Sequence, residues 1–287
     1  MHLVDAKGIL SSRNGMNIYR GCTHGCIYCD SRSKCYHIDH TFEDVEVKQN
    51  APELLEKALR SKRKKCMIGT GSMCDPYMPH EKELEIMRRC LEIIKRYGFG
   101  GSVITKSDLI LRDLDLITAI NEDSKFAVQM TLTTFDDSLC RLIEPGVCTT
   151  GRRYEVLKKM QENNVPTVVW MTPILPYIND TRKNITGLLE MCADAGVRGI
   201  ICFGMGLTLR EGNREYFYSS LDRLFPGLKK RYQQEFGLAY EVSSPRNREL
   251  MEIFNSFCEK HGIMHSPDEC FSYLSEFPEQ YKQLSLF

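Results

Sequence analysis

The feature that most constrains the fold is an alternation of short apolar runs with longer amphipathic segments from Met16 onward. The runs are rich in β-branched and apolar residues, as buried parallel strands require. They lie at residues 16–19, 66–72, 101–106, 126–134, 165–175 and 199–206. Apolar residues at three- and four-residue spacing predict helices between them, over 81–98, 152–164 and 182–196.

Six strands that alternate with helices predict repeated βαβ units and a parallel sheet. Six units are too few for a closed eight-fold barrel, so we expect an α/β fold with a partial (β/α)6 TIM-like barrel over residues 1–209. From about Arg210 the pattern changes to helices. This predicts a C-terminal helical extension over residues 210–280, which packs on the barrel and is a candidate source of substrate contacts. Residues 281–287 are expected to form an exposed tail.

The composition limits the compartment and the roles of the cysteines. The 287 residues include no apolar run of about 18 residues and no hydrophobic signal core at the start, so we expect a cytoplasmic protein with no membrane partner. Thirteen cysteines in that compartment stay mostly reduced, which leaves packing, metal binding or catalysis. The formal net charge is zero, so charge neither supports nor excludes nucleic-acid binding.

Three cysteines follow the first predicted strand, in the stretch YRGCTHGCIYCD: Cys22, Cys26 and Cys29. Groups at the C-terminal ends of barrel strands build active sites. Three thiols are too few for a closed zinc site, and an odd number does not pair into disulfides. Thiolate-rich sites select zinc or iron–sulfur clusters, and a 4Fe–4S cluster on three cysteines leaves one iron open to a substrate or cosubstrate. A zinc site completed by His24 or Cys35 is the alternative.

This CxxxCxxC motif, with Tyr28 before its last cysteine, resembles that of the radical S-adenosylmethionine (SAM) superfamily. The resemblance covers about residues 10–250. It extends to a branch near spore photoproduct lyase, often described as DNA-repair-photolyase-like. The matching segments are GTGSMCDPYMPHE (69–81), VITKS (103–107), LIEPGVCTTGRR (142–153) and TPILPYIND (172–180).

The resemblance implies a 4Fe–4S cluster on the three cysteines and SAM chelated by the open iron. An electron from a flavodoxin- or ferredoxin-type reductant then cleaves SAM to methionine and a 5′-deoxyadenosyl radical, which abstracts hydrogen from the substrate. In the lyase-like branch that substrate is DNA carrying a pyrimidine lesion or another modified base. Two alternatives stay open: radical modification of RNA, a peptide or a small metabolite, and a non-catalytic iron–sulfur or zinc adaptor on the sliding clamp.

Two strand ends carry candidates for SAM binding. Gly71, Ser72 and Cys74 follow the second predicted strand, where small residues let the backbone approach a ligand closely. Lys106 ends the third strand, and the resemblance assigns it to the SAM carboxylate. A strand-to-helix turn and a surface lysine are the structural alternatives.

The later strands offer further candidates. Gln129 and Thr131 alternate along the fourth strand and share a face, so both are expected to point into the barrel, toward the ribose and sulfonium of SAM. Met171, Pro173 and Met205 lie at later strand ends, where they frame either the adenine or substrate, or simply the core. By resemblance, Tyr28 completes the cofactor-binding set.

Two departures from the lyase pattern concern catalysis. The lyase has a hydrogen-donating cysteine near the end of its second strand, whereas this chain has Ser72 there and Cys74 two residues later. The lyase also has a tyrosine directly after the last cluster cysteine, where this chain has Asp30. Cys74 is the candidate replacement donor, and Cys35 is another if its loop folds inward.

The C-terminal tail ends in QLSLF, residues 283–287. It resembles the short motif by which bacterial polymerases and repair proteins bind the sliding clamp. Leu286 and Phe287 would enter an apolar pocket of the clamp, and Gln283 would form a hydrogen bond at the rim of that pocket. Leu284 belongs to the same motif. The alternative is a tail docked on its own domain.

Overall fold

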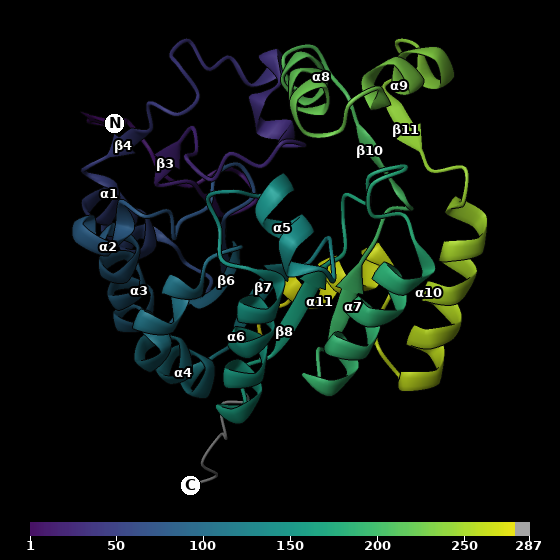
Figure 1. Ribbon diagram of the computed structural model, residues 1–287. Helices are drawn as coiled ribbons and strands as arrows, with labels where there is room; N and C mark the ends of the chain where they lie inside the picture. The colour runs from purple at the N-terminus through teal and green to yellow at the C-terminus, as the bar shows by residue number, and fades with distance from the viewer. Residues whose placement is uncertain (279–287) are drawn as a thin grey trace, which may run out of the picture.

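A six-stranded parallel sheet lies at the centre of the fold (Figure 1), and the computed structural model describes residues 1–278. In sheet order its strands are β2 (Gly15–Met16), β5 (Met67–Thr70), β6 (Gly100–Thr105), β7 (Phe126–Thr131), β8 (Thr167–Trp170) and β9 (Gly199–Ile201). The spatial order follows the chain order, with β2 and β9 at the edges. The predicted α/β fold with a partial (β/α)6 barrel is therefore confirmed.

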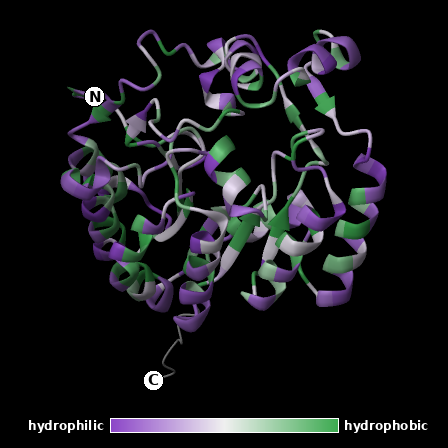
Figure 2. Ribbon diagram, in the orientation of Figure 1, coloured by the Kyte–Doolittle hydropathy of each residue, from purple (hydrophilic) through white to green (hydrophobic). Residues whose placement is uncertain are grey.

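Helices cover the outer face of this sheet (Figure 1). They are α1 (Ala51–Ser61), α2 (Glu81–Leu84), α3 (Ile86–Arg96), α4 (Leu114–Asp123), α6 (Thr150–Glu162) and α7 (Arg182–Asp194), with the 3₁₀ turn η3 (Asp108–Asp113). Helix α5 (Asp137–Ile143) lies instead against the cysteine loop, which is followed by the 3₁₀ turns η1 (Asp30–Arg32) and η2 (Lys34–Tyr36). Val128 and Met130 of β7 belong to the main core with Ile117 and Leu157 from the outer helices. Figure 2 shows hydrophilic residues along the outer helices and largely hydrophobic central strands.

The single helix predicted over residues 81–98 is wrong, because the chain breaks it into α2 and α3. Glu85 between them adopts a left-handed conformation with φ of 49°. The carboxylate of Glu81 is fully buried there, and it accepts hydrogen bonds from the Met87 amide at 2.9 Å and from Arg112 at 2.9 Å. These polar bonds hold the break, which the apolar spacing alone could not reveal.

The C-terminal part contains a small sheet as well as helices. Its elements are β10 (Gly206–Thr208), α8 (Asn213–Leu224), α9 (Leu228–Phe236), β11 (Glu241–Ser243), α10 (Asn247–His261) and α11 (Pro267–Ser275). The sequence pattern missed β11, which pairs antiparallel with β10 and is too short to show a period. Helix α10 packs on α7 and α11 packs beside β9. Cys270 and Leu274 of α11 pack on inward-facing Ala127, Val168 and Ile201.

A second small sheet, also unpredicted, lies at the N-terminal side. It has the order β1 (His2–Val4), β4 (Glu46–Lys48), β3 (Tyr19–Arg20). Strand β3 leads directly into the cysteine loop, where the Cys22 amide donates to the Phe42 carbonyl at 2.9 Å. Within residues 1–278, no helix has the length and apolar character to span a bilayer.

Candidate active site

A cavity of about 730 Å³ opens where the sheet strands end, and the cysteine loop forms one side of it. Most of the predicted site residues line it, namely Cys22, Cys26, Tyr28, Cys29, Asp30, Gly71, Ser72, Cys74, Lys106, Thr131, Pro173 and Met205. Gln129, Met171 and Cys35 are not among its lining residues. Met171 is fully buried in the main core instead. This volume suits a small-molecule or cofactor site.

The cysteine loop is held close to the barrel by tight backbone contacts. Gly21 has a φ of 86°, and a side chain there would lie 2.5 Å from the Phe42 carbonyl oxygen. Cys22 and Cys26 are 8% and 6% exposed. Burial raises the pKa of both thiols, that of Cys26 to about 12. A metal that binds them would displace the proton from each thiol.

The spacing of the three thiols separates the two metal hypotheses. A tetrahedral zinc ion with sulfur at about 2.3 Å brings its thiolates to within roughly 4 Å of one another. Among the residues that the structure describes, the group whose ligand atoms all lie within 4.8 Å is His2, His40 and Glu46, and the three cysteines form no such group. At least one pair of their sulfurs is therefore more than 4.8 Å apart, which favours a larger cluster over a single zinc ion.

Lys106 supplies a cation beside these thiols. Burial acts to lower the pKa of its ammonium, but neighbouring acidic groups outweigh burial and raise it: the Cys26 thiol when ionised, and the carboxylates of Glu144 and Asp75. The ammonium lies 5.9 Å from the centre of the Tyr28 ring. Within residues 1–278, no carboxylate lies within ion-pair distance of it. A charged lysine at the cavity wall is suited to an anionic ligand group.

Asp75 fixes the geometry around Lys106, and the sequence analysis missed it. Its carboxylate accepts hydrogen bonds from the Thr105 hydroxyl, the Lys106 amide and the Tyr77 amide at 2.7, 2.7 and 2.9 Å. Nδ1 of His24 lies 3.5 Å away. This carboxylate therefore joins the cysteine loop to the ends of β5 and β6. The sequence did contain one signal for this role, because Asp75 lies next to the small residues at the end of a predicted strand.

Tyr28 is hydrogen-bonded to a buried ion pair that the sequence analysis also missed. Its hydroxyl donates to Glu144, which pairs with Arg153, and both charged side chains are fully buried. Arg153 also donates to the Thr131 carbonyl at 2.8 Å and the Cys148 carbonyl at 2.9 Å. Burial opposes ionisation of Glu144, but Arg153 and then Lys106 lower its pKa. The network ties the cysteine loop to the α5–α6 region.

Gln129 does not line the cavity, and its side chain bonds to the neighbouring strands. Its amide donates to Ser102 at 2.6 Å and accepts from the Trp170 indole at 2.8 Å. Both polar ends are thereby used in a row of hydrogen bonds across β6, β7 and β8. Thr131, two residues later on the same face, does reach the cavity.

The opposite wall of the cavity is aromatic. Phe203 is 62% exposed, and its ring lies 6.1 Å from Trp170 and 6.3 Å from Phe271, centre to centre. Thr208, Ser243 and further residues of the β10–β11 sheet continue this wall. The C-terminal extension therefore lines the cavity.

The catalytic candidates differ in exposure. Cys74 is 6% exposed and its thiol donates to the Tyr19 carbonyl at 2.8 Å, whereas Ser72 is exposed. Asp30 accepts from the Tyr36 hydroxyl at 2.8 Å. Cys35 is exposed and accepts from Arg210 at 3.3 Å. Cys74 is therefore the candidate donor thiol that lines the cavity.

The model of the Radical SAM superfamily matches residues 16–189. This chain belongs to the radical SAM superfamily. An uncharacterized protein of Mycobacterium tuberculosis is 31% identical over 82% of this chain and 70% of its own length. An uncharacterized protein of Methanocaldococcus jannaschii is 34% identical over 58% of this chain and 61% of its own length.

Solved structures of spore photoproduct lyase share the fold. One with bound AdoMet and dinucleoside spore photoproduct superposes with a TM-score of 0.61, at 12% identity, over 87% of this chain and 74% of the lyase chain. A variant of the lyase gives a TM-score of 0.64, at 12% identity, over 92% and 80%. The cofactors of the radical SAM family are a 4Fe–4S cluster and SAM, and the widely spaced thiols and the nearby lysine fit them.

Proposed function

We propose that this radical SAM enzyme acts on DNA, at a pyrimidine lesion or another modified base. The observation that carries the proposal is the aromatic wall, where Phe203 presents an exposed ring backed by Trp170 and Phe271. Every nucleobase has a flat face that stacks on such a ring. The shared fold with spore photoproduct lyase supports the same substrate class.

The cofactor side divides into a metal part and a SAM part. Cys22, Cys26 and Cys29 hold the cluster, and the Lys106 ammonium binds the carboxylate of SAM. When bound, the reduced cluster and SAM supply the radical that takes a hydrogen atom from the substrate. The residues of the chain hold the cluster and SAM in place and separate them from solvent.

The end of β5 and the end of β7 complete the SAM pocket. Gly71 lets the end of β5 pack closely against β6, because a side chain there would lie 2.0 Å from the Ile104 carbonyl oxygen. Ser72 and Thr131 offer hydroxyls to the polar groups of SAM. Gln129 acts indirectly, by orienting Trp170 through the indole N–H. Tyr28 positions the cysteine loop, and Asp30 orients Tyr36 at the rim.

Cys74 returns a hydrogen atom to the product radical. Burial raises its pKa to about 12, so the sulfur keeps its hydrogen at neutral pH. Donation of that atom leaves a thiyl radical at the sulfur. One electron from the flavodoxin- or ferredoxin-type reductant and one proton from solvent then restore the thiol.

A base in duplex DNA must leave the stack to reach this cavity. Extrusion costs a few kcal/mol and costs least for a damaged or mispaired base. The cavity of about 730 Å³ is partly open, so an extruded base would enter it from the side of the aromatic wall. The enzyme therefore selects lesions partly because they flip out more readily.

Anaerobic incubation with UV-irradiated thymine-rich DNA tests this function. The reconstituted enzyme with reductant and SAM should remove a lesion and form 5′-deoxyadenosine, whereas unirradiated DNA should stay unchanged. Unchanged lesions during SAM cleavage would remove the photolesion proposal and favour RNA, a peptide or a small metabolite. If no 5′-deoxyadenosine forms at all, the remaining hypothesis is a non-catalytic iron–sulfur or zinc adaptor on the sliding clamp.

The sliding-clamp motif at Gln283, Leu284, Leu286 and Phe287 lies outside the described residues. Lys125, directly before β7, donates to the Glu276 carbonyl at 3.0 Å, so the described chain ends at the face opposite the cavity. This placement supports simultaneous binding of clamp and substrate. The full chain should be retained by immobilised sliding clamp, and a chain without residues 283–287 should not be. Equal retention of both would refute clamp binding.

A further inference from the structure

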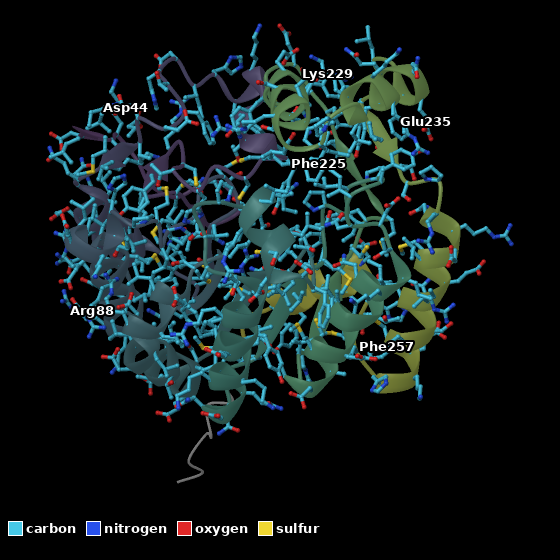
Figure 3. The ribbon with its side chains drawn as sticks, in the orientation of Figure 1. Asp44, Arg88, Phe225, Lys229, Glu235 and Phe257 are labelled. Carbon is cyan, nitrogen blue, oxygen red and sulfur yellow. The ribbon has the colours of Figure 1, made fainter. Side chains whose placement is uncertain are left out.

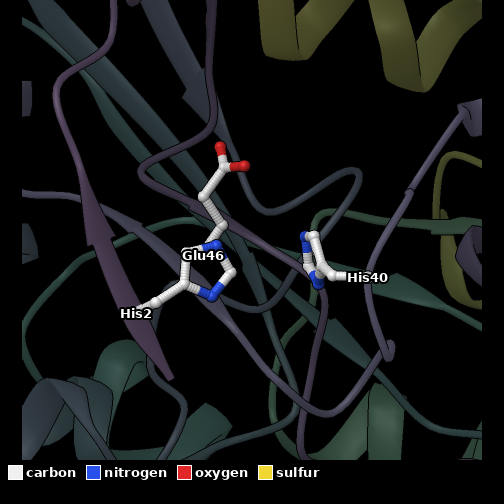
Figure 4. A group of neighbouring side chains, drawn as sticks. All are labelled: His2, His40 and Glu46. Carbon is white, nitrogen blue, oxygen red and sulfur yellow. The ribbon is translucent and has the colours of Figure 1, made fainter.

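A second group of metal-ligating side chains lies on the N-terminal sheet, outside the cavity. His2 of β1 and Glu46 of β4 are direct cross-strand neighbours in the parallel register. His40 comes from the segment between η2 and β4. The ligand atoms of all three residues lie within 4.8 Å of one another (Figure 4).

Both imidazoles are oriented by acceptors at Nδ1. In His2 this nitrogen lies 3.0 Å from the Asp44 carboxylate, and in His40 it lies 3.0 Å from the Thr41 carbonyl. A carbonyl or carboxylate accepts a hydrogen bond from Nδ1–H, so in the neutral ring the lone pair is at Nε2. A carboxylate or carbonyl behind the ring is the usual arrangement for histidines that bind metal.

His40 provides a further observation that points to a ligand. Its Nε2 is buried and has no hydrogen-bond partner in residues 1–278. A buried acceptor without a partner is unfavourable, and a metal ion would satisfy it. The edge-to-face packing of the two imidazoles, with ring centres 5.0 Å apart, leaves this nitrogen unsatisfied.

We propose that His2, His40 and Glu46 bind one zinc ion, separate from the iron–sulfur cluster. Two imidazoles and one carboxylate form a ligand set that suits zinc, with a water molecule in the fourth position. The ion joins β1, β4 and the segment before β4.

The zinc ion has a structural task in this proposal. None of its three ligands lines the cavity. Phe42, two residues after His40, accepts the hydrogen bond from the Cys22 amide. Fixing His40 therefore fixes the segment that supports the first cysteine of the cluster loop.

Zinc titration of the cluster-loaded enzyme tests this site, because iron then occupies the three cysteines. The full chain should carry no histidine tag and keep a free N-terminus. With a chromophoric chelator as competitor, it should bind one zinc per chain beyond its cluster iron. His40→Gln and Glu46→Gln should lower zinc affinity by about 100-fold or more, and Asp44→Asn by about 10–100-fold.

His37→Asn is the matched control, because His37 is exposed, lies in the same segment and has a positive φ that asparagine tolerates. It should leave zinc affinity unchanged. Zinc should also slow amide hydrogen exchange over residues 37–46 in the unsubstituted enzyme and not in His40→Gln. With chelator present, neither the unsubstituted enzyme nor His40→Gln holds zinc. Equal melting temperatures and equal cluster iron contents of the two proteins would then show that His40→Gln is folded.

Two results would overturn the zinc site. One is a cluster-loaded enzyme that binds no zinc, or that binds equal zinc with and without His40→Gln. The other is zinc that disappears on substitution of Cys26 and persists in His40→Gln, which would place the ion at the cysteine loop.

Discussion

The two walls of the cavity are built differently. On the cofactor wall, the carboxylates of Asp75 and Glu144 each accept several hydrogen bonds and are 9% and 0% exposed. On the aromatic wall, Phe203 is 62% exposed, and Phe271, which packs behind it without lining the cavity, is 40% exposed. Figure 3 draws the described side chains on the ribbon. Directional hydrogen bonds fix the cofactor wall, whereas the aromatic wall offers flat rings that few contacts hold in place.

This difference separates two tasks. A cluster and SAM need charged groups at fixed positions, so the cofactor wall must keep its shape before they bind. A nucleobase needs a flat surface that adapts to its approach, and exposed aromatic rings provide it. Substitutions on the first wall should therefore abolish cofactor chemistry or folding, whereas those on the second should affect substrate use alone.

The largest effect is expected from Cys26→Ala. Loss of one of three cluster ligands should reduce cluster iron and abolish 5′-deoxyadenosine formation, because no other thiol replaces it at that position. Iron analysis and chromatography of the nucleoside measure this. Cys35→Ala removes an exposed thiol six residues after Cys29 and should retain both properties.

Arg153→Met tests the buried ion pair of the cofactor wall. It leaves Glu144 charged and buried, so the free energy of unfolding should fall by about 3–5 kcal/mol. Arg152→Met, in the next position but with a half-exposed side chain, should cost under about 1 kcal/mol. Chemical denaturation of both variants measures this. Equal losses would show that the pair does not anchor the wall.

The same pair predicts a pH dependence. The folded pKa of Glu144 is lowered, so its stabilisation is present above its ordinary value of 4.5 and is lost as the pH falls below it. Between about pH 6 and pH 3 the unsubstituted protein should therefore lose more stability than Arg153→Met. Parallel slopes in denaturation experiments would contradict this.

Lys106→Met should weaken SAM binding by about 10–100-fold, the effect of losing a charged hydrogen bond in a partly buried site. Cluster iron should stay unchanged, since Lys106 holds no metal. Lys125→Met is the control, because Lys125 is partly buried at the opposite face. Isothermal titration with SAM measures the difference, and equal affinities would remove Lys106 from the SAM site.

Phe203→Ala should have the most selective effect. Loss of one stacked base corresponds to about 1–3 kcal/mol, so KM for lesion DNA should rise about 5–150-fold. SAM cleavage without DNA should not change. Phe135→Ala, an exposed aromatic that does not line the cavity, is the matched control. A loss of SAM cleavage in Phe203→Ala would contradict the assignment of separate tasks to the two walls.

The sequence predicted the residues whose position follows from a strand end. Lys106 and Thr131 line the cavity because parallel strands place their C-terminal ends together. Asp75 and Glu144 were missed, because their importance comes from partners distant in sequence, such as Lys106 and Arg153. The aromatic wall was missed because its rings come from β8, the β9–β10 loop and α11, which only the fold brings together.

Transfer of deuterium from substrate to SAM-derived nucleoside shows whether the radical acts on the base of damaged DNA. Lesion-bearing DNA deuterated at the thymine methyl and C6 positions would be turned over anaerobically with SAM, and the 5′-deoxyadenosine analysed by mass spectrometry. We expect deuterium in the nucleoside with the unsubstituted enzyme, and less in Phe203→Ala. Nucleoside that forms at full rate without any deuterium would contradict a radical that acts on the base of damaged DNA.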